Sequence, residues 1–120
     1  MIKSSCHCGA LRLEIEGDVP TTLTSCNCSF CRRSGALMAY YRPAQVKVLA
    51  APDTTDEYIW GDKCLAQVRC RGCGGLSHWR SLDPNETERM GVNARLFEDV
   101  ELDKIRIRRF DGADTWKFLD

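Results

Sequence analysis

Residues 65–80 read LAQVRCRGCGGLSHWR, and this stretch is the clearest indication of the fold. The segment Leu65–Cys70 is typical of a short strand, and it leads into a C-x-x-C motif that ends at Cys73 and is followed by Gly74. This spacing lets the backbone fold back so that both sulfurs face one metal ion at about 2.3 Å, and a glycine frees the turn. The segment Leu76–Arg80 is the expected return strand.

Further short strands are expected on both sides of this hairpin. Leu11, Leu13 and Ile15 alternate with charged residues, which is the period of a strand with one buried face. Ile105 and Ile107 alternate in the same way. Four more extended segments are expected at Thr21–Ser25, Leu37–Tyr41, Val46–Leu49 and Glu57–Trp60, and short helical turns at Ser29–Arg33 and around Phe97–Leu102. Because short strands between turns dominate, the sequence predicts an all-β fold with few short helical turns.

The length and charge of the chain limit the kinds of protein that it can be. With 120 residues and no repeat or long linker, we expect a single zinc-binding domain that spans residues 1–120. Its 17 basic and 17 acidic residues balance, which argues against a general nucleic-acid or membrane-surface binder. No signal peptide and no apolar stretch near the ~20 residues of a membrane span are visible. We therefore expect a cytoplasmic protein with reduced thiols and no membrane partner, of unknown oligomeric state.

Seven of the eight cysteines fall into three tight groups, and this grouping indicates the chemistry. Two dithiols complete a tetrahedron around zinc, whereas three sulfurs leave one position for water or substrate. The simplest interpretation is therefore two zinc ions, one structural and one catalytic. The structural ion would be bound by Cys6, Cys8, Cys70 and Cys73, and the catalytic ion by Cys26, Cys28 and Cys31.

Local geometry constrains two of these groups. A flat strand separates side chains i and i+2 by roughly 6.6 Å, whereas two sulfurs on one zinc lie about 4 Å apart. The backbone between Cys6 and Cys8 must therefore curl, and Gly9 permits this. If a helical turn begins at Ser29, then Cys28 or Cys31 lies near its amino end, where the helix dipole and neighbouring arginines lower the pKa of a thiol.

Several alternatives remain open for the cysteines. An even number of cysteines permits disulfides, although the spacings suit metal chelation better. A redox-active C-x-x-C motif normally lies near a βαβ pattern, which this sequence lacks. The three-sulfur group can also be a closed structural site completed by Cys64, His7 or His78, and one cluster that uses all seven thiolates is formally possible.

Other polar residues are weaker candidates. Cys64 cannot share an ion with Cys70, because a continuous strand would place the two residues ~20 Å apart. It is expected to be a buried, inert thiol, since free cysteines often pack in cores. His7 is expected to point away from the metal. His78 is a candidate hydrogen-bond donor to a zinc-bound sulfur or to substrate, or a satisfied structural residue. One strand face carries Lys104, Arg106 and Arg108, which form a solvated surface or bind a carboxylate ligand. Asn93 and Arg95 lie in an apolar segment, where they either bond to buried backbone groups or line a pocket.

The three cysteine motifs, with Gly9 after the first, Ser29-Phe30 inside the second and Gly74 after the third, resemble the glutathione-dependent formaldehyde-activating enzyme family, which also includes centromere protein V. The resemblance extends from Ser5 to about Arg80. It implies a fold of small coiled antiparallel sheets, called a β-tent, held together by zinc. It also implies the same division into a structural and a catalytic zinc, and carbon–sulfur bond chemistry that condenses glutathione with formaldehyde.

These observations lead to a first hypothesis and its rivals. The first is a zinc-dependent carbon–sulfur lyase-type enzyme that acts on a small thiol adduct, with glutathione as one candidate partner. Three thiolates leave such a zinc centre formally at minus one, which suits exchange of a thiolate better than generation of hydroxide. The rivals are a non-catalytic zinc module that binds nucleic acid or protein through Arg106, Arg108 and Arg109, and a protein for zinc storage or delivery.

Overall fold

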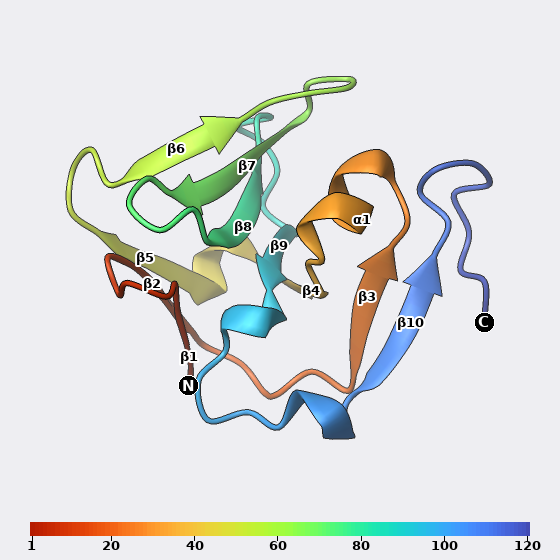
Figure 1. Ribbon diagram of the computed structural model, residues 1–120, viewed down its shortest axis with the longest axis horizontal. Helices are drawn as coiled ribbons and strands as arrows, with labels where there is room; N and C mark the ends of the chain where they lie inside the picture. The colour runs from red at the N-terminus through yellow and green to blue at the C-terminus, as the bar shows by residue number, and fades with distance from the viewer.

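The computed structural model describes residues 1–120 and contains two β-sheets and one short α-helix (Figure 1). The smaller sheet has the antiparallel order β1-β2-β5. Its strands are β1 (Ile2–Ser5), β2 (Leu11–Ile15) and β5 (Val46–Ala50). In β2 the side chains of Leu11, Leu13 and Ile15 are at most 1% exposed, so the predicted alternation places one face of this strand in the core.

The larger sheet has seven strands in the order β10-β3-β4-β9-β8-β7-β6. Its strands are β3 (Thr22–Cys26), β4 (Met38–Tyr41), β6 (Thr55–Tyr58), β7 (Leu65–Cys70), β8 (Leu76–Ser81), β9 (Met90–Asn93) and β10 (Arg106–Phe110). Five of its six neighbouring pairs are antiparallel, and β10 runs parallel to β3. This parallel pair brings the end of the chain next to the end of β3, which carries Cys26.

The helix α1 (Ser29–Ser34) follows β3 directly and lies between β3 and the β6–β7 hairpin (Figure 1). Gly35, in the left-handed conformation with φ 72°, ends it, and none of its residues is buried. Three short 3₁₀ turns complete the fold, namely η1 (Pro43–Gln45), η2 (Ala94–Leu96) and η3 (Leu102–Lys104). None of the helices is long and apolar enough to cross a membrane.

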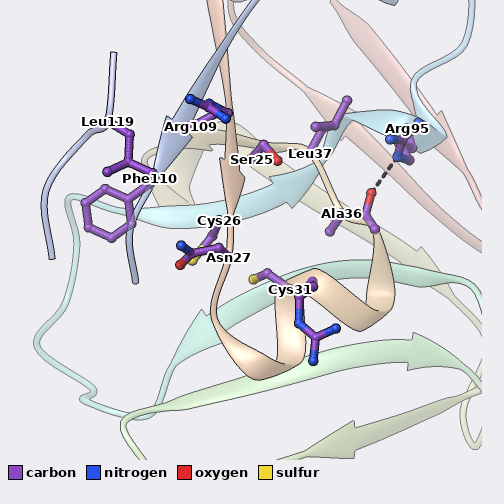
Figure 2. A pocket seen from close by; sticks show the side chains of 12 residues that line it. Ser25, Cys26, Asn27, Cys31, Ala36, Leu37, Arg95, Arg109, Phe110 and Leu119 are labelled. Atoms are coloured by element: carbon purple, nitrogen blue, oxygen red, sulfur yellow. Dashed lines mark hydrogen bonds between the residues drawn. The ribbon is translucent and has the colours of Figure 1, made fainter. Parts of the chain in front are cut away.

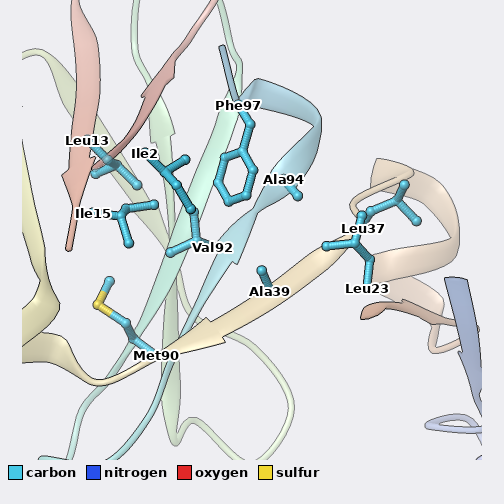
Figure 3. Close-up of a cluster of buried hydrophobic side chains, with 10 residues drawn as sticks. All are labelled: Ile2, Leu13, Ile15, Leu23, Leu37, Ala39, Met90, Val92, Ala94 and Phe97. Atoms are coloured by element: carbon cyan, nitrogen blue, oxygen red, sulfur yellow. The ribbon is translucent and has the colours of Figure 1, made fainter. Parts of the chain in front are cut away.

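The main core lies where the two sheets meet (Figure 3). Strands β1 and β2 contribute Ile2, Leu13 and Ile15, and the larger sheet contributes residues such as Val92. A second, smaller cluster of buried residues consists of Cys6, Leu11, Val68 and Cys70. Two of the predicted zinc ligands are therefore part of the packing between the sheets.

The all-β fold predicted from sequence is confirmed, and most predicted strands lie within two residues of their expected bounds. The helical turn expected around Phe97–Leu102 is wrong, because one 3₁₀ turn ends before this segment, at Leu96, and the next begins only at its last residue, Leu102. Within it, Phe97 is buried and forms a bridge to Ser4, and Asp99 has a left-handed φ of 57°, which is incompatible with a continuous helix. Strands β1 and β9 and the parallel pairing of β10 were not predicted.

Candidate metal centres and the adjoining cavity

Four sulfurs from the two sheets come together in one cluster. Those of Cys6, Cys8, Cys70 and Cys73 all lie within 4.8 Å of one another. The sulfurs of Cys6 and Cys8 are 3.7 Å apart, and those of Cys8 and Cys70 are 3.5 Å apart. Four sulfurs around a zinc ion at 2.3 Å are expected to be about 3.8 Å apart, so the donor set fits a tetrahedral zinc.

The backbone at this cluster turns sharply in both segments. After Cys8 the chain adopts the left-handed conformation at Gly9, with φ 83°, and after Cys73 it does so at Gly74, with φ 77°. The N–H of Gly9 donates to the carbonyl of Cys6, which closes the turn. The curl predicted between Cys6 and Cys8 is therefore present, because a glycine follows and can adopt positive φ.

The thiols of the four-sulfur cluster affect one another strongly. Backbone N–H groups of Cys8 and Gly75 lower the pKa of Cys73 to about 6. The N–H of Ala10 lowers the pKa of Cys8, but the thiols of Cys70, Cys6 and Cys73 outweigh it and raise this pKa to about 11. Four sulfurs at these distances cannot all carry a charge unless a cation lies among them, which a divalent ion supplies.

A second cluster contains three sulfurs within six residues. Cys26 lies at the end of β3, Cys28 is the N-cap of α1 and Cys31 lies in its first turn, and their sulfurs are all within 4.8 Å of one another. The N–H of Cys28 donates to the sulfur of Cys26 at 3.4 Å, and the N–H of Cys31 donates to the sulfur of Cys28 at 3.3 Å. The strand–helix junction thus assembles the cluster without a distant segment.

The helix lowers the pKa of only one of these thiols. Burial raises the pKa of Cys28, but the N–H of Cys31 and the thiols of Cys31 and Cys26 outweigh burial, and the net shift is downward. Burial raises the pKa of Cys31 far above its ordinary value, and the neighbouring Cys28 adds to this. The pKa of Cys26 is also raised, mainly by burial. The predicted lowering therefore applies to the N-cap residue Cys28 and is wrong for Cys31.

The segment after β10 packs directly against the three-sulfur cluster, which sequence reasoning missed. The amide of Asn27 donates to Asp111 at 3.0 Å and accepts from the N–H of Ala113 at 3.0 Å. The carboxylate of Asp111 also accepts from the N–H and the hydroxyl of Thr115. The lone Asp111-Gly112 pair indicated only a turn, because its partner Asn27 is more than 80 residues away in the sequence.

Gly112 is the point of closest approach between this segment and the cluster. A Cβ atom at Gly112 would lie 2.5 Å from the sulfur of Cys26, which is shorter than any stable contact. The hydrogen bonds between Asn27, Asp111 and Thr115 hold the loop in place, so the sulfur would have to move. The absence of a side chain at this position therefore preserves the arrangement of the three sulfurs.

We expect the substitution Gly112→Ala to weaken zinc binding by the three-sulfur cluster about 10- to 100-fold, which is the range typical of changes to the groups that orient metal ligands. Chelator competition followed by the absorption of a bound cobalt ion would measure this affinity. The exposed neighbour Asp114, changed to alanine, serves as the control and should leave the affinity unchanged. An unchanged affinity in Gly112→Ala would show that the loop yields instead of the sulfur.

A cavity of about 320 Å³ adjoins the three-sulfur cluster (Figure 2). Cys26 and Cys31 form part of its wall, and the apolar side chains of Leu37, Phe110 and Leu119 form another part. The remaining lining residues are Ser25, Asn27, Arg32, Gly35, Ala36, Arg95 and Arg109. No cysteine of the four-sulfur cluster lines this cavity.

The weaker sequence candidates lie outside both clusters. Neither Cys64, His7 nor His78 comes within 4.8 Å of all three sulfurs of the second cluster. His78 is buried and hydrogen-bonded to the hydroxyl of Ser77 at 2.9 Å, and burial lowers its pKa to about 4. His7 is exposed. The expected burial of Cys64 is wrong, because it lies in an exposed turn before β7 and donates to Asp62 at 3.0 Å.

The polar residues of the last third of the chain divide into two roles. Asn93 satisfies buried backbone, since its side chain accepts from the N–H of Leu37 and donates to the carbonyl of Leu76. Arg95 instead lines the cavity. The expected face of three basic residues is wrong, because Lys104 belongs to the turn η3 and pairs with Glu101. Arg106 and Arg108 both pair with Asp120, so the carboxylate that they bind is the chain's own.

The fold and the cysteine motifs match known proteins. The sequence profile of the glutathione-dependent formaldehyde-activating enzyme family matches residues 1–109. A Rhodobacter sphaeroides protein of known crystal structure is 31% identical in sequence to this chain. The two structures superpose with a TM-score of 0.72, and the match covers 88% of this chain and 98% of that chain. The chain therefore belongs to the glutathione-dependent formaldehyde-activating enzyme family, with two cysteine clusters that can each hold a metal ion.

Proposed function

We propose that this protein is a zinc-dependent carbon–sulfur lyase-type enzyme that acts on the adduct of a small thiol and an aldehyde, such as that of glutathione and formaldehyde. The observation that carries the proposal is the difference between the two clusters. Two cysteines of one cluster, Cys6 and Cys70, are buried in the packing between the sheets, whereas two cysteines of the other cluster, Cys26 and Cys31, line a cavity. Family membership supports the same reaction class.

Each cluster has a distinct proposed role. Cys6, Cys8, Cys70 and Cys73 would bind a structural zinc, and Cys26, Cys28 and Cys31 a catalytic one. A zinc ion held by three thiolates supplies a Lewis acid that can keep a substrate sulfur as thiolate or polarise an aldehyde. The N–H groups of Cys28 and Cys31 donate to cluster sulfurs and so stabilise their negative charge.

The proposed reaction moves one proton, and the cavity must provide a path for it. In the synthetic direction the substrate sulfur forms a bond to the carbonyl carbon, and the proton lost from the sulfur ends on the carbonyl oxygen. No carboxylate or imidazole lines the cavity, so this proton is exchanged with solvent through the open side. The cavity wall also includes the apolar side chains of Leu37, Phe110 and Leu119, none of which can take up this proton.

The rival functions find less support. Two of the arginines that favoured nucleic-acid binding, Arg106 and Arg108, pair with the carboxylate of Asp120, which offsets part of their positive charge. The proposed location is the cytosol, where thiols stay reduced and can bind metal. Zinc storage or delivery would require rapid exchange of the metal at the three-sulfur cluster and no turnover.

We expect the zinc-loaded protein, at micromolar concentration, to accelerate the exchange between formaldehyde and at least one small thiol. Proton exchange spectroscopy of the hydroxymethyl signal, with and without protein, measures this rate for a panel of thiols that includes glutathione. The same protein with its metal removed by a chelator is the control. If a protein that holds two zinc ions accelerates none of the thiols, the lyase proposal is wrong, and the rate of zinc exchange then tests the storage alternative.

A further inference from the structure

Helix α1 cannot hold its own position, because it is short and exposed. It has six residues, none of which is buried, and isolated helices shorter than about 12–15 residues are only marginally stable in water. It nevertheless carries Cys31 and has Cys28 as its N-cap, so its orientation sets where these two sulfurs lie relative to that of Cys26. The geometry of the three-sulfur cluster therefore depends on the contacts of α1 with the rest of the protein.

Side-chain contacts fasten this helix at two places. At its carboxyl end, the guanidinium of Arg95 donates to the carbonyl of Gly35. On the side of the β6–β7 hairpin, the ring of Phe30 packs against the rings of Tyr58 and Trp60. The ring centroids are 5.8 Å and 6.1 Å apart, and the ring planes are inclined by 25° and 31°. These values are typical of favourable aromatic pairs, so Phe30 attaches α1 to the hairpin.

The surface on which Phe30 rests is itself well fixed. Tyr58 is the last residue of β6, and every residue of this strand is paired with β7. The carboxylates of β6 also form ion pairs with arginines of β7, of β8 and of the turn between them, namely Asp56 with Arg69 and Arg71, and Glu57 with Arg80. The hairpin therefore offers α1 a support that does not depend on α1.

The aromatic contact contributes little to the core of the protein. Tyr58 is 52% exposed and Trp60 is 37% exposed, and neither belongs to the two buried clusters. Removal of these rings therefore leaves the packing between the sheets intact. What it removes is the attachment of α1 to the larger sheet.

We propose that Phe30 is a positioning residue for the three-sulfur cluster, with Tyr58 and Trp60 as its support. Phe30 lies between Cys28 and Cys31, in the first turn of α1, so a ring held against the hairpin also holds these two sulfurs. A metal ion that binds to pre-organised ligands has fewer groups to order, which raises its affinity. The inference rests on the proposed function only in that the three-sulfur cluster binds zinc, and it is independent of the reaction.

Metal binding by single variants tests this role without any turnover. The absorption spectrum of a bound cobalt ion reports the geometry of its ligands, and competition with zinc gives the zinc affinity. The signal that Cys31→Ser removes identifies the three-sulfur cluster. At this cluster we expect Tyr58→Ala to weaken zinc binding about threefold and Phe30→Leu, which loses both aromatic pairs, about tenfold, with a changed cobalt spectrum. Binding at the four-sulfur cluster should stay as in the parent.

Two further variants separate positioning from a general loss of packing. Phe30→Tyr keeps the ring and should keep the affinity and the spectrum of the parent. Tyr40→Ala is the matched control for Tyr58→Ala, because Tyr40 is a strand residue that is 40% exposed and packs against another ring. Its partners are Trp79, at 6.3 Å between ring centroids, and Arg89, neither of which belongs to α1. It should leave the three-sulfur cluster unchanged.

The outcomes separate this inference from the proposed function. An unchanged affinity and spectrum in both Phe30→Leu and Tyr58→Ala, or an equal change in Tyr40→Ala, would overturn the positioning role. If Phe30→Leu does not fold, Tyr58→Ala decides the question from the side of the hairpin. Weaker binding with a thermal melt like that of the parent supports the role, even if formaldehyde exchange is not accelerated. Accelerated exchange with unchanged metal binding in both variants would leave the proposed function standing and refute the inference.

Discussion

Replacing Cys73 with serine is expected to unfold the protein. The four-sulfur cluster joins the loop between β1 and β2 to the turn between β7 and β8, so it connects the two sheets. A structural zinc contributes about 10–16 kcal/mol in small zinc-binding peptides, which is as large as the total stability of about 5–15 kcal/mol of a typical domain. Loss of one ligand therefore removes a contribution that the small hydrophobic core cannot replace.

Zinc content and a thermal melt followed by circular dichroism measure this effect. We expect Cys73→Ser to lose the cooperative transition and at least one equivalent of zinc. Cys64→Ser is the matched control, because Cys64 is exposed and lies outside both clusters. The control should keep both zinc equivalents and melt within a few degrees of the parent protein. A Cys73→Ser protein that melts like the parent would refute a structural role for the four-sulfur cluster.

Replacing Cys31 with serine is expected to abolish activity while the fold persists. The three sulfurs lie within six residues, and α1 contains no buried residue, so this cluster holds only its own strand–helix junction together. We expect the loss of one zinc equivalent and a decrease in stability of about 1–2 kcal/mol, which is ordinary for a single substitution. The exchange between formaldehyde and thiol should fall to the rate without protein.

The same melt, zinc assay and exchange measurement compare the two variants directly. The expected pattern is a folded, inactive protein with one zinc for Cys31→Ser, and an unfolded protein for Cys73→Ser. Equal unfolding by both substitutions would contradict the division into a structural and a catalytic centre. Full activity of a folded Cys31→Ser protein would contradict the catalytic role of the three-sulfur cluster, but not the structural role of the four-sulfur cluster.

Much of the fold could be predicted from local pattern. The alternation at Leu11–Ile15 was visible because a strand with one buried face repeats every two residues. The strand that leads into Cys70 was visible as a short segment bounded by turn residues. Strand β9 was not visible, because it is buried at all four positions and includes Gly91 and Asn93. Its Asn93 is tolerated only because the backbone groups of Leu37 and Leu76 bond to its amide.

The grouping of the seven cysteines was predictable for a different reason. Sulfurs separated by one or two residues are close in almost any compact conformation, and a second dithiol is needed to complete a tetrahedron. The spacing also distinguished the local three-sulfur group from the two distant dithiols. In the structure the two dithiols form one cluster and the three-sulfur group forms the other. The roles of these sulfurs as zinc ligands and in catalysis stay predictions that the cysteine variants test.

The sequence alone therefore determined the all-β class, the family and the three cysteine motifs, because each depends on the residue types and spacing within short segments. Only the tertiary structure placed Gly112 against the sulfur of Cys26 and brought Arg95 and Arg109 to one cavity. The parallel pairing of β10 with β3 joins segments about 80 residues apart. Such contacts depend on the packing of the whole chain, and no local period or spacing records them.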